Sequence, residues 1–196
     1  RVYLSATLGA GGELERSFGR VAIERVNPTT AIRQGRRFYI FPDLVEDTDS
    51  IALTRQLLKE HPKALVLKQA SSSEAEMLAA DLGEGAIDLY RKDILTDPAS
   101  LQSFKSAKTG LLALANRFDG LDFPGETCRM TVLEGDLRAL NLQERFLASR
   151  VGSRHVLSER ISTRISQASG RCTRHQNDPS VAVSYTHLTL PTNREV

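Results

Sequence analysis

Two arginines near the end of the chain have the spacing of a phosphate clamp. Gln167, Arg171 and Arg174 stand at positions i, i+4 and i+7, so they share one face if the segment is helical. Two guanidinium groups this close suit phosphate oxygens, and Gly170 allows another surface to approach. The pattern predicts that Arg171 and Arg174 stabilise a transferring γ-phosphoryl group. A plain basic helix face is the alternative.

A second candidate is the segment 116–125 (NRFDGLDFPG), which directly follows an apolar run. Loops that follow a buried strand often bind ligands, and Gly120 and Gly125 permit tight approach to a ribose or phosphate. Asp119 and Asp122 can accept hydrogen bonds from a ribose hydroxyl or orient the two arginines. Because Asp and Gly are also the usual turn residues, a plain surface turn is an equal alternative.

Two further groups of small hydroxyl residues follow apolar runs. Ser5, Ala6 and Thr7 come after Val2-Tyr3-Leu4 and can relay hydrogen bonds between a nucleotide site and a neighbouring domain, although a hydroxyl-rich strand end is the simpler interpretation. Ser71 and Ser72 open a predicted helix, whose N-terminus favours an anion such as a nucleic-acid phosphate. Simple helix capping is the alternative there.

The elements that must position these residues alternate along the chain. Apolar runs of strand length and segments of helical period predict strands at 2–5, 38–41, 64–67, 86–90, 110–115, 130–133 and 181–183, and helices at 13–18, 50–60, 74–82, from 98 onward, 141–151 and 158–169. This alternation predicts an α/β fold with a parallel sheet and helices on both faces. Ligands in such folds bind at the carboxyl ends of the strands.

The composition is that of a globular protein with one ordinary domain. The chain has 196 residues, 40% of them hydrophobic and 26% charged, with a net charge of +2, which permits contact with nucleic acid without requiring it. No apolar run reaches the ~18 residues of a membrane span, so we expect no membrane contact and a cytoplasmic location. Two cysteines are too few for a disulfide framework or a zinc cluster, so we expect two buried free thiols.

In this order, the three motifs resemble motifs III, V and VI of superfamily-two helicases. The motifs are S-A-T at 5–7, N-R-F-D-G-L-D-F-P-G at 116–125 and Q-x-x-G-R-x-x-R at 167–174, and the second is most similar to motif V of the DEAD/DEAH-related DNA helicases. The resemblance covers about residues 1–184. It implies a RecA-like sheet of the P-loop NTPase type, the second motor domain of an ATP-dependent helicase that hydrolyses ATP.

The resemblance also implies a role for each candidate residue, with ATP and Mg²⁺ as cofactors. Arg171 and Arg174 would act on the γ-phosphate as catalytic residues. The remaining residues divide into those that line the ATP cleft (Gln167, Gly170, Gly120 and Asp122), those that couple hydrolysis to movement (Ser5, Ala6 and Thr7), and those that face single-stranded or duplex nucleic acid (Asn116, Arg117, Asp119, Ser71 and Ser72).

Two motifs that ATP hydrolysis requires do not occur in the sequence. There is no G-x-x-x-x-G-K-[ST] phosphate loop and no D-E-x-[HD] magnesium motif. In the family both lie on the first motor domain, so we expect this chain to be a C-terminal half that is inactive alone and needs an N-terminal RecA-like domain as partner. The alternative is a non-catalytic module that binds nucleic acid or protein on the same fold.

The expected division of the chain follows from the motif order. Residues 1–8 would end the first motor domain, 9–37 would connect, and 38–184 would form the C-terminal RecA-like domain. Residues 185–196 are Thr-rich and show no helix or strand period, so we expect a non-native or disordered tail. The resemblance of 116–125 to motif V of DNA helicases implies DNA as the nucleic acid.

Overall fold

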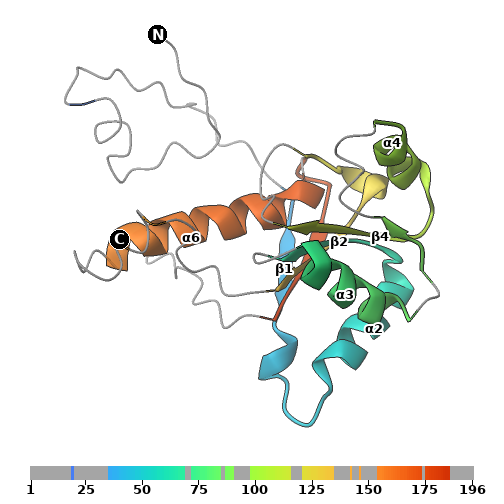
Figure 1. Cartoon of the computed structure of the whole chain (residues 1–196), viewed down its shortest axis with the longest axis horizontal. Coiled ribbons are helices and arrows are strands. Elements are labelled where there is room, and N and C mark those ends of the chain that lie inside the picture. Colours follow the sequence, from blue (N-terminus) through green and yellow to red (C-terminus); the bar gives the residue numbers. More distant parts are fainter. Residues whose placement is uncertain are drawn as a thin grey trace. The chain divides into compact units, whose positions relative to one another are not determined.

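The structure is a computed structural model of the whole chain, shown in Figure 1. It describes residues 19, 35–68, 72–84, 87–90, 98–115, 121–134, 142, 146, 154–173 and 175–185. The strands are β1 (Arg37–Ile40), β2 (Lys63–Lys68), β3 (Leu89–Tyr90), β4 (Gly110–Ala115), β5 (Met130–Glu134) and β6 (Ser180–Ser184). The α-helices are α2 (Ser50–Glu60), α3 (Ser72–Gly83), α4 (Pro98–Ser106) and α6 (Arg154–Ser169), and the short 3-10 helices are η1 (Pro42–Leu44), η3 (Gly125–Thr127) and η4 (Gly170–Cys172).

The six described strands form one sheet in the order β1-β6-β5-β2-β4-β3, and every neighbouring pair is parallel. Parallel neighbours cannot be joined by a tight turn, so each pairing needs a crossover connection. Helices α2, α3 and α4 lie in the connections between β1 and β2, β2 and β3, and β3 and β4. The predicted α/β class with a parallel sheet is therefore confirmed.

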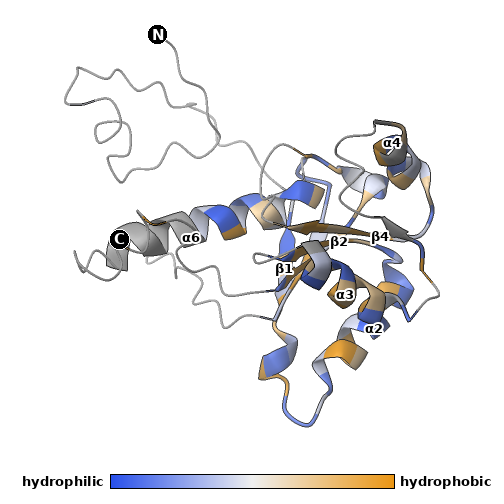
Figure 2. Cartoon of the chain, in the orientation of Figure 1, coloured by the Kyte–Doolittle hydropathy of each residue, from blue (hydrophilic) through white to orange (hydrophobic). Residues whose placement is uncertain are grey.

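One face of the sheet is covered by α2 and α3. Ala64 and Val66 of β2 point to this face and join a buried cluster with Leu58 of α2 and Leu78 and Leu82 of α3. Figure 2 shows the hydrophobic colour of β2 and β4 beside the mixed colours of these two helices. Apolar side chains at alternate positions of the strand thus pack against the apolar face of each helix, as is usual in α/β folds.

The remaining side chains of each strand point to the opposite face of the sheet. Lys63 of β2 lies over the ring of Phe104 from α4, and Thr131 of β5 contacts Cys172 of η4. Tyr39 of β1 hydrogen-bonds Ser169 at the end of α6. Helical segments therefore cover both faces of the described sheet, as the sequence predicts.

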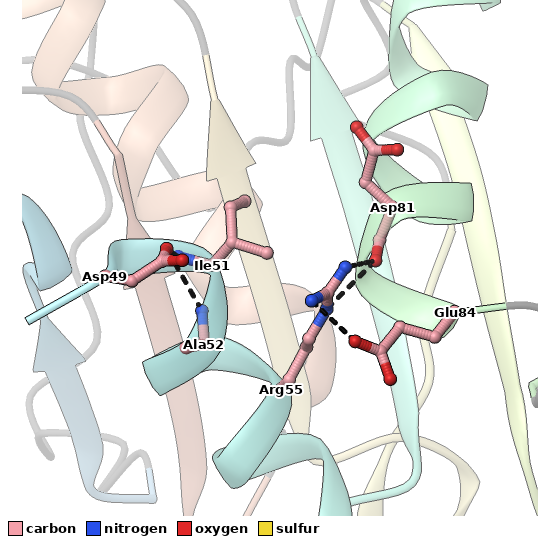
Figure 3. A network of polar contacts seen from close by, with 6 residues as sticks. All are labelled: Asp49, Ile51, Ala52, Arg55, Asp81 and Glu84. Atoms are coloured by element: carbon pink, nitrogen blue, oxygen red, sulfur yellow. Dashed lines mark hydrogen bonds and ion pairs between the residues drawn. The ribbon is translucent and has the colours of Figure 1, made fainter.

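A polar network joins the two helices of the first face (Figure 3). Asp49 caps α2 by accepting hydrogen bonds from the amides of Ile51 and Ala52. Arg55, one turn further on, donates from Nε and Nη2 to the carbonyl oxygen of Asp81 in α3 and forms an ion pair with Glu84. Because carbonyls at a helix end lack helical partners, a guanidinium satisfies them well.

Most boundaries agree with the sequence to within two residues. The predicted strand 86–90 is shorter, since the described strand β3 begins at Leu89. Tyr185, where we expected the tail to begin, instead packs against the buried cluster and hydrogen-bonds Ser50 and Thr54 of α2. The tail prediction is wrong at that residue because its partners lie in a distant helix, and residues 186–196 fall outside the description.

The predicted elements at 2–5, 13–18 and 141–151 fall outside the described residues, apart from Leu142 and Phe146. By its internal contacts the chain divides into two units, one of residues 33–138 and 164–196 and one of residues 1–32 and 139–163. The first unit contains the whole described sheet. The domain limits predicted from the motifs stay predictions. None of the described helices is sufficiently long and apolar to cross a membrane.

We expect Tyr185→Phe to lower the free energy of unfolding by about 1 kcal/mol at pH 8, because Thr54 loses a buried partner. Burial raises the pKa of Tyr185 to about 12 from 10.0. The unfolded tyrosine then ionises before the folded one, so its contribution to stability is present below pH 10 and falls between pH 10 and 12. Urea unfolding of both proteins across this pH range measures the effect.

The difference in the free energy of unfolding between the wild type and Tyr185→Phe reports on the Tyr185 hydroxyl alone. Burial also lowers the pKa of Lys63, but both proteins carry Lys63, so its opposite contribution cancels. If the two stability curves ran parallel from pH 10 to 12, the buried state of the Tyr185 hydroxyl would be contradicted.

Candidate functional site

The end of α6 does not continue as the helix that the arginine spacing suggested. The α-helix stops at Ser169, the 3-10 helix η4 spans Gly170–Cys172, and Thr173 is extended at φ −136° and ψ 121°. The helical run that contains Gln167 and Arg171 therefore ends at Cys172, and its last turn is tighter than an α-helical turn. Arg174 lies outside the described residues, so the shared face of the three residues stays a prediction.

Arg171 is held by the second candidate segment. Its Nη1 donates to the carbonyl oxygen of Leu121 at 2.9 Å and lies 3.6 Å from a carboxylate oxygen of Asp122. In the other direction, the amide of Phe123 donates to the carbonyl oxygen of Arg171 at 2.9 Å. The two motifs, 50 residues apart in sequence, are thus joined by reciprocal hydrogen bonds. The alternative of a solvated basic helix face does not describe Arg171, whose side chain is only 13% exposed.

The loop that holds Arg171 is itself anchored at Gly125. The Gly125 amide donates to the carboxylate of Asp178 at 3.0 Å, and Asp178 is buried. Gly125 adopts φ +61°, a left-handed conformation that costs glycine little and other residues more. This explains the glycine at the end of the motif. Asp178 precedes β6, so this anchor lies near the amino end of the sheet, away from the carboxyl ends where we expected the chemistry to gather.

An aromatic pair packs the same loop against α4. The ring of Phe123 is fully buried and packs edge-to-face on Phe104 of α4, with centroids 5.6 Å apart. Such pairs contribute roughly 0.5–1.5 kcal/mol beyond the area they bury. Lys63, which lies over Phe104, donates to the carbonyl oxygens of Lys105 and Ala107 at the end of α4. The loop is therefore fixed to α4 by the aromatic contact and to η4 by hydrogen bonds.

Gly170 lies where another side chain crosses the end of α6. A Cβ added at Gly170 would stand 3.2 Å from Nη2 of Arg37, which also donates from Nη1 to the carbonyl oxygen of Ser166 at 3.2 Å. The sequence suggested that Gly170 permits close approach, and the approaching group is Arg37 of β1. Sequence reasoning placed Arg37 in a connection, because nothing local indicates that its strand reaches α6.

A charged group at the carboxyl edge of the sheet was also missed. Lys68 ends β2 and forms ion pairs with Glu134, which ends β5, at 2.9 Å and with Glu74 of α3 at 3.3 Å. Burial alone would lower the pKa of Lys68, but the hydrogen bonds and charges of the two carboxylates raise it. The signal was available in principle, since both Lys68 and Glu134 close apolar runs, but their pairing needs the strand order.

Several predicted site residues fall outside the described part of the chain. They are Arg174, Ser5, Ala6, Thr7, Asn116, Arg117, Asp119, Gly120 and Ser71. Ser72 is described as the first residue of α3, without its side chain, and Gln167 is a partly exposed residue of α6. The described structure therefore brings Arg171, Asp122 and Gly170 into one region and leaves the nucleic-acid candidates untested.

The cysteines and the possible metal ligands were compared with the expectations from the sequence. Cys128 and Cys172 are both free and buried, as predicted. Among the described residues, no group of three or more His, Cys, Asp and Glu side chains could hold a metal ion.

Comparison with solved structures gives a likeness to a helicase chain. A solved structure described as an XPD helicase aligns with 78% of this chain and 32% of its own chain, at 12% sequence identity and a TM-score of 0.49. No protein-family model and no curated protein matches the chain. The alignment thus spans about a third of that helicase chain, and at this identity and score it decides nothing about function.

We expect Asp178→Ala to lower the free energy of unfolding by about 1–3 kcal/mol, because the Gly125 amide loses a charged acceptor in a buried position. Asp178→Asn is the matched control, since it keeps an acceptor oxygen of the same reach and should cost less. Urea unfolding of the three proteins checks this. Equal losses in both variants would show that the hydrogen bond to Gly125 does not anchor the loop.

Proposed function

We propose that this chain is the second, RecA-like motor domain of an ATP-dependent nucleic-acid helicase. Its task would be to close over ATP bound by a first motor domain and to couple hydrolysis to movement along a strand. The observation that carries the proposal is the contact of Arg171 with Leu121 and Asp122. It joins the two segments whose sequences resemble helicase motifs VI and V.

The geometry of Arg171 fits a phosphate-directed role. A guanidinium carries donors on three nitrogens, so a contact through Nη1 to Leu121 is compatible with further contacts to phosphate oxygens. The loop fixes the side chain before any ligand arrives, which lowers the entropic cost of positioning it. Arg171, together with Arg174, would stabilise the negative charge that develops on the transferring phosphoryl group.

The remaining candidate residues would bind ATP or couple the two domains. Gln167, Gly170, Gly120 and Asp122 would line the second-domain side of the ATP cleft, and Ser5, Ala6 and Thr7 would transmit closure between the domains. The bound magnesium would neutralise phosphate charge, with ligands supplied chiefly by the first domain. The sequence contains neither the phosphate loop nor the magnesium motif, which is why the proposal requires that domain.

Nucleic acid would run past the opposite side of the same loop. Asn116, Arg117 and Asp119 follow β4, and Ser71 and Ser72 stand at the start of α3, where helix amides favour a phosphate. Recognition through the backbone predicts binding that weakens with salt and depends little on sequence. The proposal includes DNA as the nucleic acid and the cytoplasm as the location of the protein.

ATP hydrolysis by the protein in which this chain is joined to a phosphate-loop domain tests the proposal. We expect stimulation by single-stranded nucleic acid. Arg171→Ala should lower kcat by about 10³-fold or more, the scale of arginine fingers. Arg171→Lys should not restore it, because an ammonium cannot reproduce the planar fork that contacts both the loop and a phosphate. Arg174→Ala should behave like Arg171→Ala.

Arg129→Ala is a matched control. It removes the same charge from a neighbouring segment, where Arg129 pairs with the exposed Glu126, and it should hydrolyse ATP at close to the wild-type rate. A parent protein that binds nucleic acid but does not hydrolyse ATP would favour the non-catalytic binding module. Undiminished kcat in Arg171→Ala would remove Arg171 from the proposed role.

A further inference from the structure

Two buried thiols meet where the motif segments join the sheet. Cys128, just before β5, is 1% exposed, and Cys172, at the end of η4, is 0% exposed. The Sγ of Cys128 donates to the carbonyl oxygen of Met130 at 3.3 Å, and the Sγ of Cys172 lies 3.7 Å from the same oxygen. The two sulfurs, 44 residues apart in the sequence, therefore share one backbone carbonyl oxygen as their common neighbour.

The surroundings of the two sulfurs differ in a way that assigns them different chemical roles. Burial raises the pKa of the Cys128 thiol, but interactions with Cys172 and with the backbone of Met130, together with the charge of Lys63, outweigh it, so the pKa is lowered overall. The hydrogen bond to Cys128, together with burial, raises the pKa of Cys172 well above its usual value. Cys128 is thus the sulfur better able to act as a thiolate nucleophile.

We propose that Cys128 and Cys172 form a reversible disulfide when the protein meets a low-molecular-weight disulfide. The Cys128 thiolate attacks one sulfur of the oxidant, and the first small thiol leaves as a mixed disulfide forms. Cys172 then loses its proton and attacks the Cys128 sulfur, releasing the second small thiol. The two protein thiols are oxidised to one disulfide, and the small disulfide is reduced to two thiols.

The bridge would connect the same segments that Arg171 joins. Cys172 directly follows Arg171 in η4, and Cys128 lies at the end of the loop that contains Leu121 and Phe123. Both sulfurs already contact one carbonyl oxygen, so rotation of the two side chains about that oxygen would bring the sulfurs together. The oxidant reaches Cys128 when the loop before β5 opens locally. The inference rests on the thiol geometry and not on the proposed function.

The native chain is incubated with oxidised glutathione, and its intact mass, free thiols and thermal midpoint are measured. We expect a loss of about 2 Da without an adduct, disappearance of both free thiols, and full reversal by dithiothreitol. A non-reducing peptide map should link the Cys128 and Cys172 peptides. The thermal midpoint should rise by roughly 5 °C or more, because the bridge closes a long loop of the unfolded chain.

The mass and the peptide map of the wild-type chain decide the matter even if a cysteine variant fails to fold. Glutathione adducts without an internal link would overturn the proposal. So would two thiols that stay reduced in the folded protein while the same oxidant reacts with them in urea. Cys128→Ser and Cys172→Ser provide the comparison, since each should lose the mass change and the rise in midpoint.

Discussion

The central strand β2 is the constraint on which the rest of the described structure depends. It pairs in parallel with β4 on one side and β5 on the other, and five of its six residues are buried. A strand in this position must be apolar on both faces, and its parallel neighbours require crossover connections. The helices that cover each face, and the loops that reach the sheet edges, follow from these two requirements.

The contact between Arg171 and the loop at Leu121 depends on that framework. Cys128 and Phe123 fix the end of the loop to the sheet and to α4, and Asp178 fixes Gly125 from the start of β6. Most of the partners in the loop are backbone groups, which a change of side chain does not remove. Arg171 and Asp178 supply the specific side chains. The position of the guanidinium is therefore a property of three separate segments of the chain.

The same framework explains why some expectations from the sequence were wrong. Helix α6 ends at Ser169, as predicted, but the sequence does not indicate that Tyr39 and Arg37 of the distant strand β1 bond its last turn. Tyr185 belongs to the folded unit because it hydrogen-bonds Thr54. The sequence does not indicate this contact because Thr54 lies 131 residues earlier. Lys68 and Glu134 pair because β2 and β5 are neighbours. None of these partners can be identified from nearby residues.

The sequence by itself determined the elements and the class of fold. Apolar runs and helical periods are local properties, so they predicted α2, β4 and the parallel α/β arrangement. The motif order indicated that segments 116–125 and 167–174 belong to one site. The tertiary structure decided which strand contacts the end of α6, which loop holds the Arg171 side chain, and which carboxylate anchors that loop. These depend on the strand order, which sets contacts between residues far apart in the chain and leaves no local signal.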